Sequence, residues 1–98
     1  MKYAKFWEFR PEDMDEAVTV WGAYIEESKK TPEKYPTHIY PPHGFGDITK
    51  GVSIMEADTE EQLINYMVAL SPSIKIKFVP LVDSSKVVEA YLKRKSVR

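Results

Sequence analysis

The residues best suited to proton chemistry gather in one short stretch. His38 and His43 are the only histidines of the chain, and they bracket Tyr40. An imidazole titrates near neutral pH, so it can accept or donate a proton during a reaction. Simple alternation along an extended strand places His38 and Tyr40 on one face. If that face borders a cavity, the two side chains could hold a phenol or a ketone; otherwise they are surface groups.

The same histidines raise the question of a metal site. With the carboxylate of Asp47 or Glu56, His38 and His43 would complete a facial set of ligands. The two histidines are not spaced one helical turn apart, however, and their spacing in a loop predicts no shared geometry. We therefore expect no metal and no cofactor.

Glu56 is a candidate base, because it follows Val52 and Ile54 on one face of a predicted strand. A carboxylate among apolar neighbours could have a raised pKa. Alternatively, it lies at the wet end of the strand and pairs with Lys50 or Lys5. Both interpretations remain open from the sequence.

A larger set of side chains could line a pocket for an apolar or aromatic ligand. Aromatic residues at helical spacing can equally fill a core. The candidates are Trp7, Trp21, Tyr24, His38, Tyr40 and Phe45.

Nucleic-acid and phosphate sites are not indicated. The Gly-Phe-Gly at residues 44–46 lacks the third glycine and the following helix of a phosphate loop. The Lys-Gly-Val-Ser-Ile at residues 50–54 lacks the stacking aromatic residues of an RNA-binding sheet. Net charge is −1, so we expect no nucleic-acid partner.

The elements that must position these residues are clearest between residues 51 and 82. Residues 52–57 and 74–81 are predicted strands. The helix between them begins at Asp58, with a glutamate three residues on that resembles a capping box, and Ser71-Pro72 ends it. This is a β-α-β unit.

A similar unit precedes it. Residues 2–10 form a predicted strand, Pro11 begins a helix, and Thr31-Pro32 ends that helix. Residues 37–40 form a short strand at a sheet edge, and residues 41–50 form a long loop. The apolar residues of the helix follow at helical spacing: Met14, Ala17, Val18, Trp21 and Ile25.

A third helix, capped by Asp83 or Ser84, is predicted near the end of the chain, with four residues facing inward: Val87, Val88, Tyr91 and Leu92. The order β-α-β-β-α-β is that of an α+β, ferredoxin-like domain with a four-stranded antiparallel sheet. We expect residues 1–98 to form one such domain with an extra C-terminal helix.

Both faces of the first strand carry large apolar groups. Tyr3, Trp7 and Phe9 share one face with Lys5, and Phe6 lies on the other. Two helices cover only one face, and each large side chain left exposed costs about 1.5–3 kcal/mol. We expect a homodimer packed sheet against sheet, with a C-terminal helix folded back as the alternative.

Composition places the chain among ordinary soluble proteins, with 43% hydrophobic and 30% charged residues. The absence of cysteine excludes disulfides and thiolate chemistry. No signal-peptide core and no apolar run of about 20 residues is present. We expect a cytoplasmic protein without membrane association.

Two segments carry a resemblance to a known family: Gly-x-x-Ile-x-Glu-Ala-Asp at residues 51–58 and Phe-x-Pro-x-x-Asp at residues 78–83. The chain resembles small dimeric α/β-barrel proteins, and within that superfamily it is most similar to the uncharacterised domain-of-unknown-function family 3303. The resemblance implies a ferredoxin-like fold, a dimeric barrel, and a cavity between sheet and helices. Better-studied relatives include cofactor-free monooxygenases, isomerases and haem-binding enzymes.

The leading hypothesis is a homodimer that binds a small apolar or aromatic metabolite in that cavity. The second is a cofactor-independent monooxygenase or isomerase that uses His38, Tyr40 or His43 for proton transfer. The third is an interaction module, in which Trp21, Tyr24 and Met67 fill the space between helices and sheet.

Overall fold

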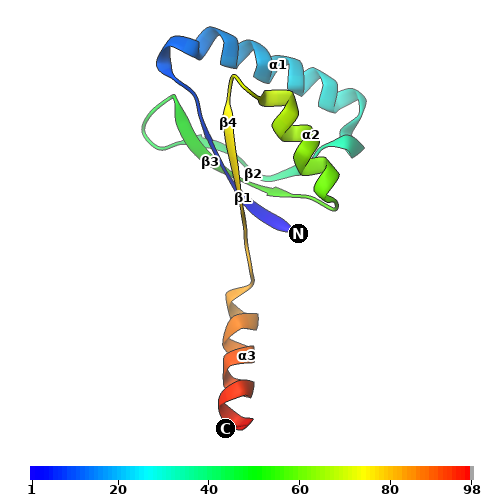
Figure 1. Ribbon diagram of the computed structural model, residues 1–98, viewed down its shortest axis with the longest axis vertical. Helices are drawn as coiled ribbons and strands as arrows, with labels where there is room; N and C mark the ends of the chain where they lie inside the picture. Colours follow the sequence, from blue (N-terminus) through cyan, green and yellow to red (C-terminus); the bar gives the residue numbers. More distant parts are fainter. Residues whose placement is uncertain (98) are drawn as a thin grey trace.

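Four antiparallel strands form one sheet in the order β2-β3-β1-β4, and α1 and α2 pack on one side of it (Figure 1). The computed structural model describes residues 1–97. Short 3-10 turns at Pro11–Asp13 and Pro32–Lys34 flank α1. The α+β, ferredoxin-like prediction is confirmed. The elements are β1 (Lys2–Glu8), α1 (Met14–Lys30), β2 (Thr37–Gly44), β3 (Lys50–Glu56), α2 (Glu60–Leu70), β4 (Lys75–Pro80) and α3 (Ser84–Val97).

The start of α2 corrects one detail of the prediction. The N-cap is Thr59, not Asp58, because the Thr59 hydroxyl accepts the backbone N–H of Gln62. The side-chain oxygen of Gln62 accepts the N–H groups of Asp58 and Thr59 in return, at 2.7 and 3.3 Å. This reciprocal pair is a capping box that fixes the first turn of the helix.

Strand β2 extends further than predicted. It continues through Pro41 and Pro42 to Gly44, so the connection to β3 is only residues 45–49. Prolines are tolerated there because β2 is an edge strand and needs no donor on its outer side. The register of β2 on β3 shifts between His38 and Tyr40, and again between Tyr40 and His43.

The strand register separates the two faces of the sheet. Lys5 pairs with Ser53, and Trp7 pairs with Gly51; these residues face the helices. The helices and this face share a core that contains Tyr24, Tyr35, Met55, Tyr66, Leu70 and Ile74.

The opposite face, which we call the open face, is not covered by any helix of the described residues. Phe6 pairs with Val52 there, and Ala4 pairs with Ile54. Phe6 remains 38% exposed, and Tyr40, which pairs with Ile54, is 47% exposed. An apolar sheet face of this kind is unusual on an isolated chain.

Helix α3 contradicts the prediction of an inward apolar face. It extends away from the sheet (Figure 1), and Val87, Val88, Tyr91 and Leu92 are each more than half exposed. The Leu81 N–H donates to the Lys2 carbonyl at 2.9 Å, so the chain continues along β1 and leaves the sheet at its end. The radius of gyration of 16.7 Å therefore exceeds the value of about 13 Å for a compact chain of this length. In this structure α3 does not cover the open face.

Candidate functional site

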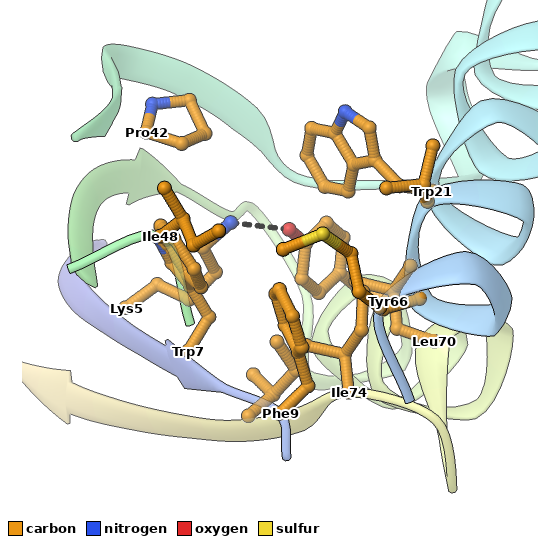
Figure 2. A pocket seen from close by; sticks show the side chains of 13 residues that line it. Lys5, Trp7, Phe9, Trp21, Pro42, Ile48, Tyr66, Leu70 and Ile74 are labelled. Atoms are coloured by element: carbon orange, nitrogen blue, oxygen red, sulfur yellow. Dashed lines mark hydrogen bonds between the residues drawn. The ribbon is translucent and has the colours of Figure 1, made fainter. Parts of the chain in front are cut away.

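A cavity of about 660 Å³ lies between α1, the helix-covered face of the sheet and the β2–β3 hairpin (Figure 2). This volume lies within the range of small-molecule sites in proteins. Nearly all of its lining is apolar. The lining residues are Lys5, Trp7, Phe9, Met14, Ala17, Val18, Trp21, Pro42, Ile48, Tyr66, Leu70, Ile74 and Ile76.

Each wall of the cavity comes from a different element. Most of the apolar stripe predicted on α1 forms one wall, so these side chains border a space that packing leaves empty. Trp7 lies across Gly51, where a Cβ atom would collide with the indole ring and with the His43 carbonyl group. Glycine at residue 51 therefore makes room for an aromatic wall on the sheet side.

Lys5 is the one charged residue of the lining, and it is only 1% exposed. Its ammonium nitrogen donates to the Tyr66 hydroxyl at 2.5 Å (Figure 2). The same nitrogen lies 5.2 Å from the ring centroid of Trp21 and 4.9 Å from that of Tyr66, distances at which aromatic faces attract a cation. Among residues 1–97, no carboxylate lies within ion-pair distance of Lys5.

Burial without a counter-charge lowers the pKa of Lys5 from 10.5 to about 7. Removing an ammonium group from water disfavours its charged form. At neutral pH this side chain therefore exists as both ammonium and free amine. The ammonium can bind an anion, whereas the free amine is a base and a nucleophile.

His38 lies beside Lys5, with its Nε2 atom 3.5 Å from the ammonium nitrogen. Burial, and then the positive charge of Lys5, lower the pKa of His38 to about 4. The ring is therefore neutral at pH 7. This differs from the predicted role, because a histidine that titrates near pH 4 is not poised for proton transfer at neutral pH.

Two neutral hydroxyl groups complete the surroundings of Lys5. Burial, followed by the nearby Tyr24, raises the pKa of Tyr66 far above its usual value, so its hydroxyl stays protonated. Ser53 is the cross-strand neighbour of Lys5 on β3 and faces the same side of the sheet. It is fully buried, and its hydroxyl has no hydrogen-bond partner among the described residues.

The predicted pairing of His38 with Tyr40 is wrong. His38 pairs with Met55 and Tyr40 pairs with the next residue, Ile54, so β2 has one extra residue at this point. Such a bulge reverses the alternation of side chains. His38 faces the helices, while Tyr40 lies on the open face and stacks on His43 with ring centroids 4.5 Å apart. The three side chains therefore do not converge on one cavity, and the proton-transfer hypothesis loses the geometry on which it depended.

The acidic candidates lie away from the cavity. Glu56 is exposed at the end of β3, on the face opposite Lys5, and within residues 1–97 it forms no ion pair with Lys50 or Lys5. The Asp47 carboxylate accepts the N–H and the hydroxyl of Thr49, at 2.7 and 2.6 Å. The described part of the chain contains no group of three residues that could hold a metal ion.

The predicted pocket residues divide into three groups. Trp7 and Trp21 line the cavity. Tyr24 and His38 pack around Tyr66, at ring-centroid distances of 5.0 and 6.4 Å; Tyr24 belongs to the core beside the cavity, and His38 is partly buried there. Tyr40 lies on the open face, as does Phe45, whose ring centroid is 6.4 Å from that of Phe6.

Lys5 was not among the site residues predicted from the sequence. A signal was available, because Lys5 shares a strand face with three aromatic residues (Tyr3, Trp7 and Phe9). A lysine in the middle of such a face is rarely buried without a partner. Its position indicated either an exposed face or a functional charge.

Comparison with known proteins places the chain in a family. A family model described as "Domain of unknown function (DUF3303)" matches residues 1–95. Searches among curated proteins and among solved structures found no match. No helix in the described residues is both long and apolar enough to cross a bilayer. With nearly its whole length matched, the chain belongs to the DUF3303 family.

Proposed function

We propose that this protein is a homodimer that binds a small apolar or aromatic metabolite in the cavity beneath α1. The observation that carries the proposal is the cavity itself. Its walls are aromatic and aliphatic, with few polar groups, which is typical of small-molecule sites.

The unfilled space favours ligand binding over a plain interaction module. The latter hypothesis required Trp21, Tyr24 and Met67 to fill the gap between helices and sheet. Trp21 instead borders the cavity, and Tyr24 packs against Tyr35 and Tyr66. A concave apolar space of about 660 Å³ matches the size of small-molecule sites in proteins.

The open face supports the homodimer. Its centre is apolar, and Lys75 and Lys77 of β4 lie toward one edge, where Lys75 pairs with Glu8 at 3.6 Å. An apolar centre with a charged rim is the usual composition of a protein interface. Two such faces packed about 10 Å apart would bury Phe6 and Ile54 of both chains.

Ligand binding can be tested with a thermal-shift screen of aromatic acids, quinones and haem. We expect at least one compound to raise the melting temperature of the wild type. Ala17→Phe should abolish that increase, because Ala17 is buried in the cavity wall and a larger side chain would occupy the space. Val68→Phe, at an exposed position of α2, is the matched control. No stabilisation by any compound, or equal stabilisation of Ala17→Phe, would contradict the proposal.

Sedimentation equilibrium tests the dimer independently of any ligand. We expect a particle of twice the chain mass of 11.3 kDa. A single 11.3 kDa species at micromolar concentration would exclude the sheet-to-sheet dimer.

A further inference from the structure

The polar side of the cavity carries a positive charge that no described residue balances. We propose that the ligand of this cavity is an organic carboxylate, with an apolar body against the aromatic walls and its carboxylate bound by the ammonium group of Lys5. This inference rests on the proposed ligand-binding function and adds the chemical class of the ligand.

No described residue supplies a negative charge to balance the ammonium group of Lys5. Every element packed around Lys5 presents a neutral group to it. These groups are Trp21 from α1, His38 from β2, Ser53 from β3, Tyr66 from α2 and Phe78 from β4. Within the part of the chain that the structure describes, the cavity lining contains neither aspartate nor glutamate.

The described neighbours of Lys5 also leave part of its hydrogen-bonding capacity unused. A lysine ammonium group has three donors, and the neighbours provide two acceptors: the Tyr66 hydroxyl at 2.5 Å and, more weakly, His38 Nε2 at 3.5 Å. The indole N–H of Trp7 also lacks an acceptor among the described residues, but this atom is buried and does not reach the surface of the cavity. Among the described residues, the Lys5 ammonium group therefore has one more donor than its neighbours can accept.

The free energy of the buried ammonium group favours an anionic ligand. A buried ammonium without a partner is unfavourable, and a carboxylate supplies both the opposite charge and strong acceptor oxygens. A neutral apolar ligand would leave the ammonium uncompensated, and a cation would be repelled. A doubly charged phosphate would need more donors than this apolar cavity provides. A carboxylate on an apolar body fits both parts of the site.

Matched pairs of probes separate the charge from the apolar body. Benzoate, phenylacetate and 2-naphthoate are each compared with the corresponding neutral amide by isothermal titration calorimetry at pH 6. We expect at least one acid to bind at least tenfold more tightly than its amide. Lys5→Met should reduce this preference to less than threefold, whereas Lys86→Met, on the exposed surface of α3, should retain it.

A second measurement on the wild type needs no variant. Because the carboxylate binds the ammonium form, its affinity should fall by up to tenfold per pH unit above about pH 7, where burial places the pKa of Lys5. At pH 8, binding of the acid should also cause Lys5 to take up a proton from the buffer. The measured heat of binding should therefore depend on the ionisation enthalpy of the buffer. The affinity of an amide should not depend on pH in this way.

The outcomes distinguish the two proposals. If acid and amide bind equally in the wild type, the carboxylate inference is overturned while ligand binding stands. A preference for acids that persists in Lys5→Met also overturns it, because another group then binds the anion. If no probe of any pair binds, and the thermal-shift screen also finds no ligand, both proposals fail.

Discussion

The two faces of the sheet reverse the usual distribution of polar and apolar residues. The face covered by helices contains a lysine, a serine and a histidine, of which Lys5 and Ser53 are fully buried. The uncovered face presents Phe6, Ile54 and Tyr40. Among residues 1–97, no negative charge complements the covered face, and no helix covers the apolar centre of the open face. The proposed ligand would complement one face, and the proposed second chain would complement the other.

The largest effect is expected from a charge at the centre of the open face. Ile54→Glu would place two carboxylates in an apolar interface, because the cross-strand neighbours of Ile54 are Ala4 and Tyr40. Dimerisation should therefore weaken by at least a hundredfold. Sedimentation equilibrium across a range of concentrations measures this. Val68→Glu, on the exposed surface of α2, should leave the dimer unchanged. A fully dimeric Ile54→Glu variant would show that the open face is not the interface.

On the covered face, Lys5→Met should stabilise the protein at pH 6. A folded-state pKa of about 7 against an ordinary value of 10.5 corresponds to a cost on the order of 4–5 kcal/mol, present in full below pH 7. Losing the hydrogen bond to Tyr66 offsets part of the gain. We therefore expect a net stabilisation of about 2–4 kcal/mol in urea denaturation at fixed protein concentration.

The pH dependence provides the control for this variant. Between pH 7 and 10.5 the unfolded chain binds more protons at Lys5 than the folded chain, so wild-type stability should rise by about 1.4 kcal/mol per pH unit. Lys5→Met should lack this rise, and Lys86→Met should keep it. Parallel pH profiles for the wild type and Lys5→Met would show that Lys5 titrates normally.

His38 should produce a smaller effect in acid. Its pKa is about 4 in the folded protein and 6.5 when unperturbed, so the unfolded chain binds more protons between these values. Stability is therefore lost as the pH falls from 6.5 to 4. Because the ring is only half-buried, we expect a loss of about 1–2 kcal/mol. His38→Phe should flatten this part of the urea-denaturation profile, whereas His43→Phe, at an exposed position, should not.

The smallest effect is expected at Ser53, whose buried hydroxyl has no partner among the described residues. Ser53→Ala should raise the free energy of unfolding by about 1 kcal/mol, because an unsatisfied polar group is removed from the core. Ser73→Ala should not be stabilising, since the Ser73 hydroxyl donates to Glu16 at 2.8 Å. Clear destabilisation by Ser53→Ala would indicate that this hydroxyl is hydrogen-bonded in solution.

The sequence was sufficient for the order of elements, because periodicity and helix-ending residues are local signals. The stripe on α1, the stop at Thr31-Pro32 and the edge position of β2 all follow from short segments. The sequence predicted less well which side chains lie together in the folded chain. One extra residue in β2 reversed the expected faces of His38 and Tyr40, and no local pattern indicates such a bulge. Similarly, the apolar residues of α3 predicted a buried helix face, but no described residue of the chain packs against them and they remain exposed.

The candidate site was only partly predictable for the same reason. Trp7 and Trp21 were identified by residue type, since aromatic side chains commonly line pockets. The position of Lys5 depends on which face of β1 the helices cover. Alternation along β1 left both faces plausible, because each carries large apolar residues.

The central claim is that Lys5 is a buried cation without an internal counter-charge, and its pKa tests this most directly. The measurement is a pH titration of the lysine ¹³Cε resonances by NMR, with the Lys5 signal assigned from its absence in Lys5→Met. The account predicts a midpoint near pH 7 for Lys5, which moves upward when a bound carboxylate is added. A midpoint near 10.5, like that of an exposed lysine, would contradict it.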